Sequence, residues 1–174
     1  MTKDELFERN MLALSSTQSI EASILIRNAQ PGGMKTEWAK DGSIVPVLEA
    51  KDGRSIALHS RYNPQEQAKK LASTYGQQGF YVFLGLGGGY EILSILQRSP
   101  VSRGIIIEYD AAYMRELLST VDLTPILADR RLSLCVDMEE TALVNLIAQR
   151  FVPAVTGNLV TAGTNRCAIR FTKA

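Results

Sequence analysis

A run of glycines that follows an apolar segment is the strongest candidate for a ligand site. Residues 81–84 are apolar, and they lead directly into Gly85, Gly87, Gly88 and Gly89. Glycines allow a sharp turn and a close backbone approach to a ligand, while unpaired N–H groups at the start of a following helix attract an anion or a carboxylate. The pattern therefore predicts a cofactor-binding turn. A tight turn required only by packing is the alternative.

The spacing of these glycines departs from the dinucleotide fingerprint. That fingerprint is G-x-G-x-x-G, and here Tyr90 stands where the third glycine is expected, which weakens a prediction of NAD or FAD. Glu108 lies 21 positions after Gly87, close to the offset at which an acidic side chain accepts hydrogen bonds from a ribose. Tyr90 and Glu108 thus join the glycines as candidate contacts for a nucleoside. A solvent-exposed acid at a strand end would have the same position.

Two further acids follow strand-like runs. Asp110 precedes a helical pattern, and Asp137 stands three residues before Glu140, which is the spacing of a capping box. Either acid could contact a nucleotide base, and Asp137 is kept as a candidate cofactor contact. Helix capping is the favoured role for both.

The best-marked polar cluster outside the glycines surrounds the only histidine. His59, Arg61, Tyr62 and Asn63 come just before a helical segment, where they could contact a phosphate, a sugar or an acceptor, and Glu91 is a further candidate. We expect His59, Arg61 and Tyr62 to lie near the glycine turn. A lone histidine more often forms a structural hydrogen bond, which is the alternative.

Several catalytic chemistries find no support in the sequence. There is no G-x-S-x-G nucleophile elbow, Walker A loop or H-E-x-x-H zinc motif, so no catalytic residue is assigned. Cys135 and Cys167 lack the paired spacing of a zinc site or a redox dithiol, and we expect reduced, buried thiols and no metal.

The elements that would position these residues alternate between strand and helix after residue 79. Such alternation is typical of a parallel sheet, and nearly continuous apolar strands predict helices on both faces. We therefore predict an α/β, Rossmann-like, mostly parallel sheet with the glycine turn at its carboxyl edge. The predicted strands are 80–84, 104–107 and 132–136, and the predicted helices are 90–97, 111–119 and 139–149.

The first 60 residues are expected to form an appendage of a helix and a small β-hairpin, with 61–174 as the Rossmann-like domain, all in one structural unit. A helix is predicted over 2–29, with a capping box of Thr2 and Glu5 and a potential break at 15–19. The hairpin pairs 44–48 with 55–59 around Lys51-Asp52-Gly53. Asn63, Pro64 and Glu66 begin a helix that runs to about residue 75. Residues 159–162 and 167–171 form either a closing hairpin or one strand with an irregular end.

Composition limits the partners. The chain has 174 residues, 45% of them hydrophobic and 21% charged, and a net charge of +1 without a dense basic run. We therefore expect one packed domain that binds neither nucleic acid nor a membrane, with oligomerisation left open. The start lacks the features of a signal peptide, so a cytoplasmic location is expected.

Several segments in sequence order together resemble the N-terminal region of the motility-associated factor (Maf) glycosyltransferases, bacterial proteins linked to flagellin glycosylation. The order of the segments carries the resemblance more than any single one. Where the family commonly has a histidine and a proline, this chain has Glu91 and Tyr109. The segments are 58–64 with Glu66 and Ala68, 84–90, 105–108 with the helix at Ala111, 122–127 and 129–132.

The resemblance implies an accessory domain, because the catalytic domain of that family lies C-terminal to this region and we expect 174 residues to be too few to contain it. Such a domain could bind a nucleotide or nucleotide-sugar component, flagellin, or a downstream glycosyltransferase domain. The competing enzyme hypothesis is an S-adenosylmethionine-dependent methyltransferase, although Phe83 stands where that class usually has an acid. A non-catalytic structural or dimerisation module is the third hypothesis.

Overall fold

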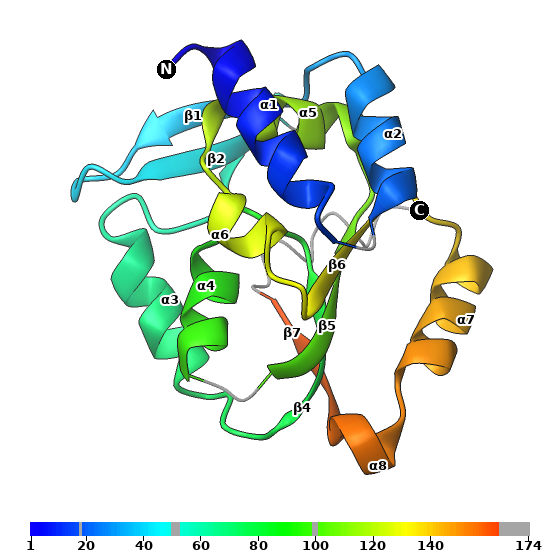
Figure 1. The fold of residues 1–174 in the computed structure, drawn as a ribbon. Coiled ribbons are helices and arrows are strands. Elements are labelled where there is room, and N and C mark those ends of the chain that lie inside the picture. The colour runs from blue at the N-terminus through cyan, green and yellow to red at the C-terminus, as the bar shows by residue number, and fades with distance from the viewer. Residues whose placement is uncertain (18, 50–52, 99–100, 164–174) are drawn as a thin grey trace.

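Two β-sheets form the framework of the protein in a computed structural model that describes residues 1–17, 19–49, 53–98 and 101–163 (Figure 1). The first is an antiparallel sheet in the order β1-β2-β3, and the second is a parallel sheet in the order β6-β5-β4-β7. The strands are β1 Met34–Trp38, β2 Ile44–Glu49, β3 Ser55–Ala57, β4 Gly79–Leu84, β5 Val101–Glu108, β6 Leu132–Val136 and β7 Asn158–Ala162.

Helices cover both faces of the parallel sheet, which confirms the predicted α/β class. The larger core lies on one face, where alternate strand residues such as Tyr81, Ile106 and Leu134 pack against α1 to α6. On the other face, Phe80, Ile105 and Cys135 belong to a smaller core with Leu143 of α7. Apart from Leu84, which is partly buried, every residue of β4 and β6 is buried, as expected for strands covered on both sides. The helices are α1 Lys3–Leu14, α2 Ile20–Asn28, α3 Pro64–Ala72, α4 Tyr90–Arg98, α5 Ala111–Thr120, α6 Thr124–Leu127, α7 Glu140–Arg150 and α8 Pro153–Thr156.

Side-chain caps begin several of these helices where the sequence indicates them. Thr2 and Glu5 form the predicted capping box of α1, and the Asn63 and Asp110 side chains accept backbone N–H groups at the starts of α3 and α5. The prediction of a capping box at Asp137 is wrong. The cap of α7 is Glu139, without a side-chain bond, because Asp137 adopts φ 52° and its N–H donates to the Glu108 carbonyl instead.

The N-terminal segment packs into the main core. The expected break near residues 15–19 is present, so α1 and α2 are separate helices, and Phe7, Met11, Leu14 and Ile26 all belong to the larger core. The hairpin of β2 and β3 is confirmed, although Lys51 and Asp52 of its predicted turn lie outside the described residues. Strand β1 was not predicted, and β3 ends at residue 57, so His59 lies beyond the sheet.

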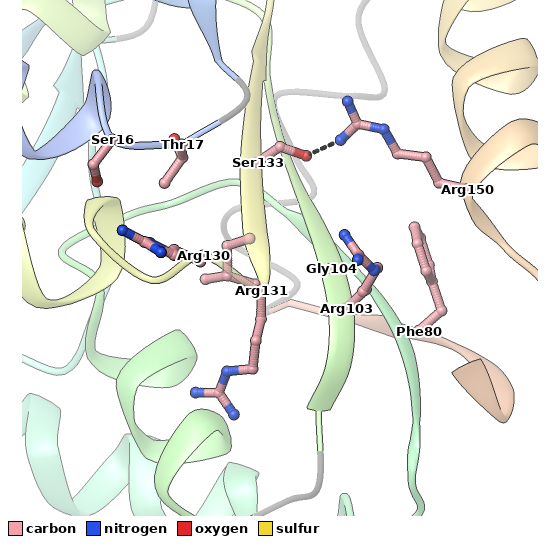
Figure 2. Close-up of a pocket in the computed structure, with 10 residues that line it drawn as sticks. Ser16, Thr17, Phe80, Arg103, Gly104, Arg130, Arg131, Ser133 and Arg150 are labelled. Carbon is pink, nitrogen blue, oxygen red and sulfur yellow. Dashed lines mark hydrogen bonds between the residues drawn. The ribbon is translucent and has the colours of Figure 1, made fainter. Parts of the chain in front are cut away.

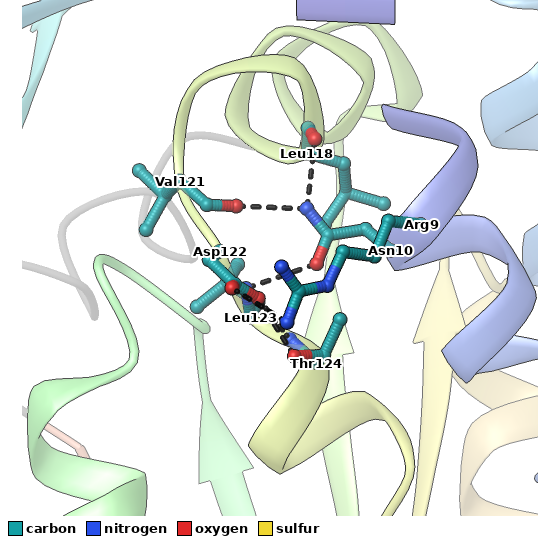
Figure 3. A network of polar contacts seen from close by, with 7 residues as sticks. All are labelled: Arg9, Asn10, Leu118, Val121, Asp122, Leu123 and Thr124. Atoms are coloured by element: carbon teal, nitrogen blue, oxygen red, sulfur yellow. Dashed lines mark hydrogen bonds and ion pairs between the residues drawn. The ribbon is translucent and has the colours of Figure 1, made fainter. Parts of the chain in front are cut away.

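A buried asparagine joins α1 to the segment between α5 and α6 (Figure 3). The Asn10 side chain is fully buried, and its Nδ2 donates to the carbonyls of Leu118 and Val121, each at 2.8 Å. Its Oδ1 accepts the N–H of Leu123 at 2.9 Å. One side-chain amide therefore hydrogen-bonds to backbone carbonyls at the end of α5 and to a backbone N–H at the start of α6. These bonds fix the position of α6.

At the end of the described chain, β7 lies beside β4 in the parallel direction, so residues 159–162 form a strand of the main sheet and no hairpin partner is described for them. The predicted partner, 167–171, and Cys167 lie outside the described residues. In the described part of the chain, none of the helices is of a length and hydropathy that could cross a bilayer.

Candidate functional site

The glycine turn lies where the sequence predicts, between β4 and α4 at the carboxyl edge of the parallel sheet. Gly85, Gly87 and Gly89 have φ values of 88°, 54° and 82°, in the left-handed region that L side chains rarely adopt. The Gly85 N–H continues the sheet by donating to the Ile107 carbonyl at 3.0 Å. These torsion angles turn the chain from the strand into the helix within five residues, 85–89.

All five residues of the turn are buried. A Cβ atom on Gly89 would lie 2.7 Å from the side chains of both Leu123 and Ile126, which belong to the segment of α6. A Cβ atom on Gly88 would lie 2.8 Å from the ring of Tyr90. Glycine is therefore required here by the close packing of neighbouring side chains as well as by the backbone torsions.

Glu108 supports the turn from the neighbouring strand. Its carboxylate accepts the Leu86 N–H at 2.8 Å, and the residue is only 1% exposed. The acid that the sequence marked as a ribose acceptor thus bonds to the backbone of the glycine turn itself. Contact with a ribose stays a prediction, and it would require this side chain to become accessible.

His59 and Glu91 form a buried pair against the same turn. The Gly88 N–H donates to His59 Nε2 at 2.6 Å, and His59 Nδ1 lies 3.0 Å from the carboxylate of Glu91. A backbone amide can only donate, so Nε2 is the acceptor and the proton resides on Nδ1, which donates to Glu91. His59 is fully buried with both ring nitrogens engaged. In this conformation the ring holds the turn and has no nitrogen available for proton transfer to a ligand.

Tyr90 connects the turn to the antiparallel sheet. Its hydroxyl donates to the Ile44 carbonyl at 2.7 Å, and its ring packs edge-on against His59 with centroids 5.1 Å apart. Desolvation by burial is the largest influence on its hydroxyl and raises the pKa of Tyr90. Tyr90 is therefore a neutral donor that fixes the start of β2 relative to the turn.

Arg61, Tyr62 and Asn63 make their contacts elsewhere. Arg61 Nε donates to Glu37 of β1 at 2.6 Å, and Lys40 Nζ lies 4.3 Å from the ring centroid of Tyr62, which is 67% exposed. Asn63 caps α3. The structure thus brings His59, Glu91 and Tyr90 to the glycine turn, whereas Arg61 and Tyr62 support the β1–β2 hairpin. A binding role for these two residues stays a prediction.

Asp137 is the one candidate cofactor contact that is exposed to solvent, at the end of β6. It borders a cavity between α2 and α7 rather than the glycine turn. No group of three or more metal-binding side chains occurs within the described ranges.

The sequence reasoning missed a cluster of arginines at the opposite, amino edge of the sheet. Arg103, Arg130, Arg131 and Arg150 line one cavity there. Their segments are far apart in the chain, so no basic run marks them. The available signal was the position of three of them directly at the amino ends of predicted strands.

Comparisons with known proteins show which proteins share the fold or part of the sequence. No protein-family model matches the chain. An uncharacterized protein of Treponema pallidum (strain Nichols) is 35% identical over 86 residues, which make up 47% of this chain and 30% of that protein. The structure of MAf glycosyltransferase from Magnetospirillum magneticum AMB-1 covers 98% of this chain at a TM-score of 0.62 and 17% identity, over 34% of its own length. This chain therefore shares its fold with part of that enzyme and spans about a third of either relative.

Proposed function

We propose that this chain is an accessory α/β domain of a Maf-type protein glycosyltransferase. The observation that carries the proposal is the fold match, which extends over 98% of this chain but only 34% of the Magnetospirillum enzyme. The sequence resemblance to the N-terminal region of the Maf family, which rests on the order of its short segments, supports the same assignment independently of the fold.

The interior of the glycine turn favours an organising role for this domain. The side chains of His59, Glu108 and Tyr90 each hydrogen-bond to the protein's own backbone, and His59 also bonds to Glu91. Such a domain would act by docking against the catalytic region or by presenting an acceptor such as flagellin. The burial of the turn weighs against the methyltransferase alternative, which needs Glu108 to reach a ribose.

A gene deletion tests the proposal. Removing the region that encodes residues 1–174 from the source organism should abolish a glycan mass increment on flagellin or other surface proteins, measured by intact-protein mass spectrometry. Complementation with the full gene should restore it, and a gene carrying Arg27→Gln, a change at an exposed residue of α2 that is paired with Glu8, should restore it equally. Unchanged glycans in the deletion strain would refute the proposal. Loss of a methyl group with glycans intact would favour the methyltransferase.

Nucleotide binding at the glycine turn is a second, finer proposal. Its support is the left-handed turn at the carboxyl edge of the sheet, and it requires Leu123 and Ile126 to move away from Gly89. Calorimetric titration with nucleotide sugars, S-adenosylmethionine and its demethylated product tests it. Any affinity located at the turn should be lost in Gly87→Val and reduced in Glu108→Gln. Affinity that both variants retain would place the ligand elsewhere.

A further inference from the structure

A cavity of about 260 Å³ lies at the amino edge of the parallel sheet, the end opposite from the glycine turn. Four arginines from three segments line it: Arg103 of β5, Arg130 and Arg131 just before β6, and Arg150 in the last turn of α7. Among the described residues that line this cavity, none is Asp or Glu. In a chain whose net charge is only +1, this is a local concentration of positive charge.

Two of these guanidinium groups have identified partners. Arg131 forms an ion pair of 2.6 Å with Asp129, and Arg150 donates to the hydroxyl of Ser133. No described residue forms an ion pair with Arg103 or Arg130. Like charges that gather in one cavity repel each other, and the repulsion is relieved when an anion binds between them.

The strand register brings Arg103 and Ser133 to the same face of the sheet. Arg103 and Ile105 share one face of β5, Ser133 and Cys135 share one face of β6, and Ile105 and Cys135 both belong to the core under α7. Figure 2 shows Arg150 reaching from α7 to Ser133, with Arg103 and Phe80 on the same side of β6. Arg130 and Arg131 lie on the other side of β6 in this view.

The side chains have the chemistry of a phosphate site. A guanidinium group offers planar, paired N–H donors that match the oxygens of a phosphate, and its charge does not depend on pH in the physiological range. Ser133 is 5% exposed, and its hydroxyl oxygen accepts from Arg150, so its own proton remains for donation to an anion. Arg150 and Ser133, which are hydrogen-bonded to each other, and Arg103 on the same face of the sheet thus provide donors to a cavity whose described lining contains no carboxylate.

A second cavity of about 500 Å³ adjoins the first along the outer strand β6. Thr17 and Arg150 line both cavities, so the two are neighbours. The second is lined in part by apolar side chains, which include Leu25 of α2, Met138 just before α7 and Leu146 of α7, and its lining also includes Glu21 and Asp137. It offers room and apolar contact for an uncharged organic group attached to a phosphate.

We infer that the amino edge of the sheet binds a small organic phosphate, with its phosphoryl group held by Arg103, Arg150 and Ser133 and its uncharged part lying along β6. Arg130 adds positive charge from the far side of the strand. The inference does not depend on the proposed glycosyltransferase role, because it rests on a different edge of the sheet and on different residues.

Calorimetric titration of the whole chain with inorganic phosphate, uridine monophosphate and uridine tests the inference. We expect phosphate to bind weakly, uridine monophosphate to bind more tightly and uridine not to bind. Arg103→Gln and Arg150→Gln should each weaken uridine monophosphate binding by roughly tenfold or more, because each removes charged hydrogen bonds. Arg103→Lys should give an intermediate loss, since it keeps the charge and loses the paired donors.

The matched control is Arg27→Gln, which removes one positive charge from the exposed end of α2 and should leave the affinity unchanged. Each variant is compared by circular dichroism to establish that it is folded. If Arg150→Gln does not fold, Arg103→Gln decides alone, because Arg103 has no ion pair among the described residues. Failure of both phosphates to bind, equal binding by uridine, or wild-type affinity in the folded glutamine variants would overturn the inference.

Discussion

The amide of Gly88 donates a hydrogen bond of 2.6 Å to Nε2 of His59, a residue 29 positions earlier in the chain. The same ring donates through Nδ1 to Glu91, in the first turn of α4. The imidazole therefore joins the segment after β3, the glycine turn and α4. Its contribution should be visible in the stability of the whole domain.

Substitution of the histidine tests this role. His59→Ala leaves the Gly88 N–H and the Glu91 carboxylate without their partner in a buried place, so the free energy of unfolding should fall by roughly 2 to 5 kcal/mol. Urea denaturation measures the loss. Glu91→Gln keeps a carbonyl acceptor for Nδ1 and should cost clearly less. Equal stability of His59→Ala and wild type would contradict the assigned contacts.

Two glycines separate the cost of backbone torsion from the cost of packing. Gly89 and Gly42 have nearly the same φ, 82° and 83°, but a Cβ atom would meet Leu123 and Ile126 at the first and nothing within 4 Å at the second. Gly42→Ala should cost about 1 kcal/mol for the left-handed backbone. Gly89→Ala should cost roughly 1 to 3 kcal/mol more because of overpacking. Thermal or urea unfolding of the two variants measures the difference in the free energy of unfolding. A similar loss in both variants would show that the α6 segment does not pack closely against Gly89.

Substitution of Asn10 should lower the free energy of unfolding more than substitution at most other positions of α1. Asn10→Ala removes three hydrogen bonds from buried backbone groups of the α5–α6 segment, and we expect a loss of roughly 3 kcal/mol. Asn28→Ala, at an exposed position of α2, is the matched control and should change stability little. If both asparagines tolerate alanine equally in urea denaturation, the amide of Asn10 does not hold α6.

The buried thiol of Cys135 should make the protein less stable at alkaline pH. Burial raises the pKa of its thiol to about 11, so in the native state the group stays protonated at pH values where the unfolded chain loses the proton. The unfolded state then binds fewer protons, and the free energy of unfolding falls as pH rises between about 9 and 11. In a Cys167→Ser background, wild-type Cys135 should show a steeper fall than Cys135→Ala. Parallel pH profiles for the two proteins would count against this effect.

Most of the sheet could be predicted from sequence because the strands β4, β5 and β6 are apolar runs separated by amphipathic segments. Strand β1 could not, since Met34–Trp38 is mostly polar and is a strand because it pairs with β2. The failed capping box at Asp137 has a similar cause. Its spacing suits a cap, but the backbone leaves β6 through a left-handed residue whose N–H is already bonded to Glu108.

The position of the candidate site could be predicted from the sequence, but the elements that pack around it could not. The glycine pattern gives a turn at the carboxyl edge of the sheet, and no local pattern indicates that α6, which begins 35 residues after Gly89, covers it. The cavity lined by arginines likewise depends on the three-dimensional arrangement of the chain and not on a local sequence pattern. It forms because β5, β6 and the end of α7 meet at one edge of the fold, and none of these segments is strongly basic alone.

The bond between Glu108 and Leu86 bears on how glycine turns of this kind are interpreted in other sequences. A phosphate bound at such a turn would accept hydrogen bonds from the backbone amides, and here a side-chain oxygen of Glu108 from the adjacent strand already accepts one of them. The protein thus carries its own acceptor at this place. A turn can therefore combine left-handed glycine torsions with a backbone amide that is hydrogen-bonded from within the same chain.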